Sequence, residues 1–200
     1  MNNVFTGRFV RLAAYDPEEM SKAYSRWNRN SEYVRLLNSS SRPMQSPKAA
    51  LKWMEEEIGE MSLNNYPFSI RTLAEDTLIG EIGLDVVTWP GRDAFVGLGI
   101  GEPEHWNKGY GTDIMTVLLR FAFSEINLRR VTLTVFEYNR RAIRSYEKAG
   151  FQHEGRLRSA LNKEGKRWDM LYMGIRREEW LDSTSRLQAQ SSGLENRIRM

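Results

Sequence analysis

The chain has 200 residues, of which 40% are hydrophobic, enough to bury one good core with no need for a second domain. It contains no cysteine, so disulfides, thiolate metal sites and a cysteine nucleophile are excluded. Its net charge of +3 is spread over 29 basic and 26 acidic residues, a balance that suits a polyanionic ligand and an ordinary solvated surface equally well.

The first part of the chain predicts a short strand and two amphipathic helices. Residues 9–12 alternate briefly, as a first strand does. Asp16-Pro17-Glu18-Glu19 predicts a capping box that starts a helix ending near Asn30. Ser46-Pro47 opens a second helix, and residues 34–43 between the two helices are expected to form an irregular loop. The second helix has a predicted buried stripe of Ala50, Leu51, Met54, Ile58 and Met61.

Three strands are predicted next, at residues 68–73, 77–88 and 94–100, with turn residues between them. We expect an antiparallel meander. Gly97 and Gly99 in its third strand permit a β-bulge and the close approach of a ligand, or else accommodate a bulky neighbouring side chain.

A glycine-containing loop from Glu104 to Thr112 follows that strand and precedes an apolar helical face over residues 114–126. Such a turn presents free backbone N–H groups to a phosphate, aided by the helix dipole, although it also occurs as a plain helix entry. The nucleoside-triphosphate loop is excluded because Lys108 precedes Gly109, and the dinucleotide fingerprint is excluded because Ile114 replaces its third glycine. We predict a phosphorylated ligand at this loop.

The remaining elements are a strand at 130–136, a helix at 139–149 ended by Gly150, and a hairpin of 151–160 with 167–175. One strand-helix-strand unit must pair in parallel, so the fold class is α+β with a mixed, mostly antiparallel sheet flanked by helices. Residues 182–200 are polar and are interpreted as a flexible extension of a domain at 1–181. No secretory signal or run of about 20 apolar residues is present, so we expect a cytoplasmic protein.

The order of strand, Asn139, short helix, Tyr146 and Gly150-Phe151, after the glycine loop, resembles the C-terminal half of the GNAT acetyltransferases. The resemblance covers roughly residues 7–180 and is closest to the ribosomal-protein N-terminal acetyltransferase and spermidine acetyltransferase branch. It implies transfer of the acetyl group of acetyl-coenzyme A (acetyl-CoA) directly to a primary amine, without a metal. It also implies a parallel strand pair that splays apart to hold the pantetheine arm.

The resemblance also implies the site residues. Tyr146 would be the general acid, although it also fits a core position, and Asn139 would both cap its helix and bind the pantetheine arm. Trp106 stands where the family usually has Gln or Arg, so we expect weakened pyrophosphate binding, with Lys108 supplying part of the missing charge. The implied donor-binding residues are Leu98, Gly99, Ile100, Trp106, Asn107, Lys108, Gly109, Tyr110, Gly111, Thr112 and Asn139.

The base and the acceptor are left open. Glu81 and Asp85 share one face of a strand, where Glu81 would take the amine proton through a water or hold a cationic substrate, unless that face is merely solvated. His105 and His153 are expected at the surface. The acceptor is either a protein N-terminal amine or a polyamine held by acidic residues. Those acidic residues would be Glu55, Glu56, Glu57 and Glu60, although four glutamates opposite an apolar stripe more often form a solvated helix face.

The expected partners are therefore acetyl-CoA and an amine, with a homodimer or larger homo-oligomer also considered. A membrane is not expected as a partner. Nucleic acid is not expected either, since no basic stripe with exposed aromatics is found. The alternative from another class is a catalytically inactive coenzyme A-binding module that acts as a sensor or assembly partner.

Overall fold

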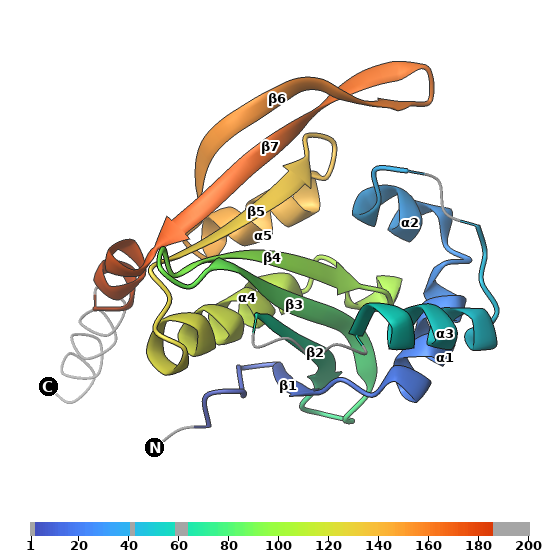
Figure 1. The fold of residues 1–200 in the computed structure, drawn as a ribbon, viewed down its shortest axis with the longest axis horizontal. Helices are drawn as coiled ribbons and strands as arrows, with labels where there is room; N and C mark the ends of the chain where they lie inside the picture. The colour runs from blue at the N-terminus through green and yellow to red at the C-terminus, as the bar shows by residue number, and fades with distance from the viewer. Residues whose placement is uncertain (1–2, 41–42, 59–63, 186–200) are drawn as a thin grey trace, which may run out of the picture.

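The computed structural model describes residues 3–40, 43–58 and 64–185 (Figure 1). The strands are β1 (Val10–Ala14), β2 (Asn65–Thr72), β3 (Leu78–Thr88), β4 (Asp93–Ile100), β5 (Arg130–Phe136), β6 (Gln152–Lys163) and β7 (Lys166–Arg176). The helices are α1 (Pro17–Trp27), α2 (Ser31–Leu37), α3 (Pro47–Ile58), α4 (Tyr110–Arg120) and α5 (Arg140–Lys148). A 3-10 turn (Pro103–His105) precedes α4, a π-helical turn (Phe121–Glu125) follows it, and residues 177–185 are helical. Residues 186–200 of the predicted extension lie outside the described residues.

The strands form one sheet in the order β1-β2-β3-β4-β5-β7-β6. Every neighbouring pair is antiparallel except β4 and β5, which confirms the predicted mixed, mostly antiparallel sheet. The parallel pairing joins only Asp93–Phe95 to Arg130–Thr132. Both strands continue well beyond these residues, so they separate toward their carboxyl ends.

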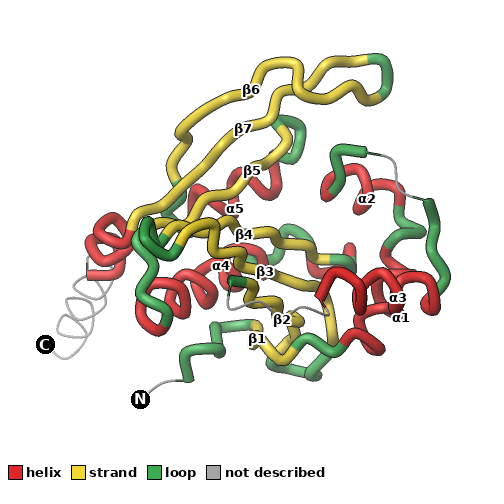
Figure 2. The backbone as a smooth tube through the Cα atoms, viewed as in Figure 1, coloured by secondary structure: helices red, strands yellow, loops and turns green. Residues whose placement is uncertain are grey.

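Two apolar clusters hold the elements in place. In the larger one, α4 packs on the sheet, where Ile82 and Leu84 of β3 meet Ile114 and Leu118 and all four are at most 1% exposed. Burying side chains of this size contributes about 1.5–3 kcal/mol each. The smaller cluster joins α1, α2 and α3 at one end of the sheet (Figure 2).

The start of α4 is tied to the beginning of the chain by Asp113. Its carboxylate accepts hydrogen bonds from the backbone N–H groups of Arg8, Phe9 and Val10, at 2.9, 2.7 and 3.2 Å. Hydrogen bonds to an ionised acceptor are among the stronger ones in proteins. The glycine loop, which immediately precedes Asp113, is therefore anchored to β1.

The structure adds a helix that the sequence analysis had assigned to a loop. Helix α2 begins because the side chain of Asn30 accepts hydrogen bonds from the backbone N–H groups of Glu32 and Tyr33, at 3.0 and 3.3 Å. Asn30 takes an extended conformation to do so, and α1 accordingly ends at Trp27 instead of near Asn30. The expectation of an irregular segment at residues 34–43 was wrong for residues 34–37.

Two smaller expectations also change, and a third is confirmed where the structure describes it. Asp16 caps α1, but Glu19 pairs with Arg71 instead of completing the capping box. Strand β4 keeps a continuous register against β3, and the irregularity lies in β3 around Val87, so the bulge expected in β4 is absent from that pairing. In the stripe predicted for α3, Ala50 and Met54 are buried, whereas Met61 and the side chain of Ile58 lie outside the described residues.

Candidate functional site

The separation of β4 from β5 opens a cleft of about 610 Å³. Its walls are residues 96–100 of β4 and 134–136 of β5, and it is completed by α2, the loop before α4 and one face of α5. Beyond Phe95, β4 has no ladder partner on the β5 side. Its backbone N–H and C=O groups on that side are therefore available to a ligand that lies between the strands.

Gly97 and Gly99 have different roles in the cleft wall. A Cβ on Gly97 would meet nothing within 4 Å, so this glycine leaves open space. A Cβ on Gly99 would lie 3.0 Å from the Tyr33 hydroxyl and 3.6 Å from Leu37. Gly99 therefore accommodates the packing of α2, which is the second of the two roles considered from the sequence.

The N-terminus of α4 is a candidate anion site. Gly109 occupies the N-cap position with φ +88°, a conformation that favours glycine, and no side chain caps the helix there. By contrast, the starts of α1, α2 and α5 are capped by Asp16, Asn30 and Asn139. The first-turn N–H groups of α4 have no intrahelical acceptor, and the positive end of the dipole adds to their attraction for a phosphate.

Trp106 does not present its indole N–H to this anion site. Its Nε1 donates to the Ile100 carbonyl at 2.8 Å, and the Arg141 guanidinium lies 3.9 Å from the ring centroid. Arg141 also forms an ion pair with Glu32 at 3.2 Å. The indole therefore supports a cation that comes from α5.

The basic face of α5 was missed in the sequence analysis. Arg141, Arg144 and Lys148 line the cleft, and their spacing of three and four residues places them on one helical face. Lys108, which was expected to supply charge, is exposed and is not among the described residues that line the cleft. The i, i+3, i+7 spacing of basic residues in α5 was the available signal.

Most of the predicted donor-binding residues come together in the cleft lining. These are Leu98, Gly99, Ile100, Trp106, Asn107, Gly109, Gly111, Thr112 and Asn139. Tyr110 instead packs against Phe9 and His105, with ring centroids 5.7 and 5.1 Å apart. Neither Tyr110 nor Lys108 belongs to the described lining.

Asn139 and Tyr146 stand at the two ends of α5. The Asn139 side chain accepts from the backbone N–H of Ala142 at 3.2 Å, which makes it an N-cap, and it also lines the cleft. Tyr146 lines the cleft although it is only 7% exposed, and its ring packs near Phe151 at 6.0 Å. Burial raises the pKa of Tyr146 to about 12, so its hydroxyl keeps its proton at neutral pH.

Glu81 lies one strand away from the cleft. It pairs with Gly99 across β3 and β4 but does not belong to the described lining. The Tyr15 hydroxyl donates to Glu81 at 3.4 Å, and burial, followed by the charge of Glu81, raises the pKa of Tyr15. Asp85 accepts from the Asn65 amide at 2.6 Å, and burial raises its pKa.

The two histidines differ. His153 is exposed, as expected, with Nε2 3.0 Å from Glu147 Oε1. His105 is half-buried in the cleft wall, contrary to the surface position expected for it. Its Nδ1 is buried without a hydrogen-bond partner among the described residues.

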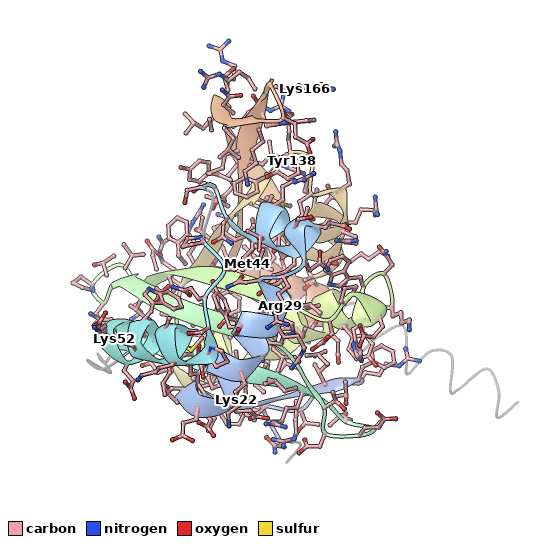
Figure 3. The ribbon with its side chains drawn as sticks, turned by 90° about the vertical axis from the view of Figure 1, so that its right-hand side faces the viewer. Lys22, Arg29, Met44, Lys52, Tyr138 and Lys166 are labelled. Carbon is pink, nitrogen blue, oxygen red and sulfur yellow. The ribbon has the colours of Figure 1, made fainter. Side chains whose placement is uncertain are left out.

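Helix α2 and the residue after it are linked by side-chain contacts to the segment after β5 and to the β6–β7 hairpin. The Tyr138 hydroxyl donates to the Arg35 carbonyl at 2.8 Å, and Lys163 Nζ donates to the Asn38 carbonyl at 2.5 Å. Arg35 pairs with Glu164 at 2.6 Å. Figure 3 shows Tyr138 below the hairpin, whose outer end carries Lys166.

Two other kinds of site are absent from the part of the chain that the structure describes. Residues 3–40, 43–58 and 64–185 contain no group of three or more His, Asp or Glu side chains that would hold a metal ion. None of the helices in these ranges has the length and apolar character needed to cross a bilayer.

Comparison with known proteins gives consistent matches. A family model described as "Acetyltransferase (GNAT) domain" matches residues 10–152. The SPbeta prophage-derived uncharacterized N-acetyltransferase YokL of Bacillus subtilis is 29% identical over 177 residues, covering 88% of this chain and 94% of YokL. The uncharacterized N-acetyltransferase YoaA of the same organism is 35% identical over 92 residues, or 46% and 51% of the two chains.

Solved structures share the fold. The spermidine N-acetyltransferase from Vibrio cholerae, in complex with CoA and spermine, superposes with a TM-score of 0.74 at 24% identity, covering 86% of this chain and 98% of that one. A GNAT-family acetyltransferase from Bacillus anthracis superposes with a TM-score of 0.71 at 19% identity, covering 87% and 98%. At these identities the likeness establishes the fold alone.

Proposed function

The chain belongs to the GNAT acetyltransferase family, as its sequence resemblance predicted, and we propose that it transfers the acetyl group of acetyl-CoA directly to a primary amine. The observation that carries this proposal is the cleft between β4 and β5. Along it lie an uncapped helix N-terminus, an unpaired strand edge and the buried Tyr146 hydroxyl. A phosphate requires free N–H groups, which the helix N-terminus offers. An amide-containing arm requires backbone partners, which the strand edge offers, and a thioester requires a proton donor for its departing sulfur, which Tyr146 offers.

The described residues fit the donor. The N–H groups at the start of α4 would hold the pyrophosphate, and Arg141, Arg144 and Lys148 would balance its charge and that of any further phosphate. The pantetheine amides would pair with the free edge of β4 and with Asn139. Tyr146 lines the same cleft, and β4 and β5 are paired at Asp93–Phe95.

In the reaction, acetyl-CoA supplies a thioester, whose carbonyl carbon gains a C–N bond to the amine as its C–S bond breaks. Tyr146 gives its phenolic proton to the departing sulfur, and its raised pKa keeps that proton available throughout the neutral range. The amine must lose a proton. We propose that a chain of water molecules carries this proton to Glu81. Water is needed because Glu81 lies on β3, opposite Gly99, and does not belong to the described lining.

The proposal extends to the domain organisation. The strands from β1 to β7 share one sheet, which supports treating residues 1–181 as one acetyltransferase domain.

The decisive experiment combines donor binding with turnover. Calorimetry with acetyl-CoA should give saturable binding, and a thiol-detecting assay should then give amine-dependent release of coenzyme A. Absence of donor binding by the folded protein would refute the proposal. Donor binding with no release of coenzyme A for any amine tested would instead support an inactive coenzyme A-binding module.

A further inference from the structure

We propose that the acceptor is a primary amine carried on an apolar, uncharged body, and that polyamines are poor acceptors. The inference rests on the proposed function, whose acceptor it specifies. It follows from the kinds of side chain that line the cleft and from the partners of the carboxylates around it.

One side of the cleft is apolar. Leu36 and Leu37 of α2, Leu98 of β4 and Met170 of β7 line it and are all half-buried, so each retains surface that a ligand can cover. Phe136 adds a nearly buried ring beside them. These residues belong to α2 and the strands, whereas the basic residues of the lining belong to α5. The lining is therefore divided between an apolar acceptor side and a basic donor side.

The charges of the lining have one sign. Among the described residues that line the cleft, the side chains with a permanent charge are Arg141, Arg144 and Lys148. A polyamine that presents one neutral amine for acetylation still carries at least one further ammonium group. That group would enter a cleft whose described lining offers it no carboxylate and whose apolar wall cannot replace its water.

The carboxylates near the cleft already have partners. Glu32 pairs with Arg141 at 3.2 Å, and Glu164 pairs with Arg35 at 2.6 Å. Glu137 and Asp169, which adjoin the lining residues Phe136 and Met170, both pair with Arg156, at 3.0 and 2.9 Å. Each of these carboxylates is therefore already paired with an arginine, which weakens its attraction for a polycation.

Lys163 places a further positive charge beside α2. Lys163 Nζ is held by the Asn38 and Arg35 carbonyls, at 2.5 and 3.3 Å, beside the apolar residues of α2. The likeness to the spermine-bound Vibrio cholerae structure does not oppose the inference, because at 24% identity it carries the fold and not the acceptor.

Two sources offer the required chemistry: a small arylalkyl amine, and the N-terminus of a peptide that begins with an apolar residue. The test measures kcat/KM for release of coenzyme A with phenethylamine, with a neutral peptide beginning with leucine, with a peptide beginning with aspartate, and with spermidine. We expect at least one apolar acceptor to exceed both spermidine and the aspartate peptide by roughly 10-fold or more. The arm that wins identifies the source.

Variants test the location. Leu36→Glu and Ser39→Glu each place a carboxylate in the lining and should raise the spermidine-to-apolar ratio of kcat/KM by roughly 10-fold. Ser39 is exposed, so the second variant should fold even if the first does not. Val87→Glu is the matched control, because Val87 is 62% exposed and lies outside the described lining. It should leave the ratio unchanged.

The outcomes separate this inference from the proposed function. A wild-type protein that acetylates spermidine or the aspartate peptide at least as well as the apolar amines would overturn the inference and leave the acetyltransferase proposal standing. Ratios that stay at the wild-type value in both lining variants would also overturn it. Failure to bind acetyl-CoA, or donor binding without turnover of any of the four acceptors, would refute the acetyltransferase proposal itself and the inference with it.

Discussion

Replacement of Tyr146 by phenylalanine removes one hydroxyl and keeps the ring that packs beside Phe151. The volume of the core is almost unchanged, so folding and acetyl-CoA binding should stay close to wild type at neutral pH. Turnover with an accepted amine should fall by roughly 10²-fold or more, because proton transfer from a positioned acid contributes at least that factor. The hydroxyl therefore matters to the reaction more than to the fold.

The same hydroxyl has a predictable effect on alkaline stability. Its pKa is about 12 in the folded protein against an ordinary value of 10.0, so above pH 10 the unfolded chain loses this proton before the folded protein does. The stabilisation is fully present below pH 10 and is lost as the pH rises through about 12. Two pKa units correspond to roughly 3 kcal/mol of unfolding free energy, the larger part of which wild type should lose by pH 11.5 relative to the phenylalanine variant.

The assays are steady-state release of coenzyme A at pH 7 and urea melts of both proteins at pH 7, 10 and 11.5. Comparing the two proteins cancels the titration of the other tyrosines and lysines. Wild-type turnover in the variant would remove Tyr146 from the mechanism. Equal alkaline destabilisation of the two proteins would contradict the burial argument for its pKa.

Three further substitutions probe the rest of the site. Gly109→Asp should weaken acetyl-CoA binding in calorimetry by roughly 10-fold or more, since it sets a carboxylate beside the pyrophosphate site. Gly109→Ala has the same unfavourable φ of +88°, and its Cβ would lie 3.7 Å from the nearest atom, so it should weaken acetyl-CoA binding much less. Equal losses of affinity in the two variants would contradict the charge argument. Arg141→Ala should raise the Kd for acetyl-CoA by roughly 10-fold, because it removes the guanidinium that stacks on Trp106. Arg140→Ala should leave the Kd unchanged, because Arg140 is exposed and outside the described lining. Equal effects of the two variants would exclude Arg141 from donor binding. Glu81→Gln should lower kcat by about 10-fold, less than Tyr146→Phe does, because it acts only through water; an unchanged kcat would exclude Glu81.

Local patterns in the sequence were sufficient for much of this fold. Alternation over residues 130–136 predicted β5 with its correct ends, and the asparagine at 139 predicted the start of α5. The glycine loop predicted a turn that enters a helix, and Gly109 is the N-cap of α4. These features depend on hydrogen bonds and dihedral angles within a few residues, so neighbouring residues suffice to specify them. The parallel strand pair follows from the same element order.

The composition of the site was decided by contacts between residues far apart in the chain. The Arg141 guanidinium stacks on the indole of Trp106, which lies 35 residues earlier. The Tyr138 hydroxyl donates to the Arg35 carbonyl, 103 residues away. Glu81 lies on the predicted strand, yet only the sheet register placed it opposite Gly99 and outside the described lining. The energy of such contacts depends on how whole elements pack, and a local pattern of residues carries no information about a partner 100 positions away.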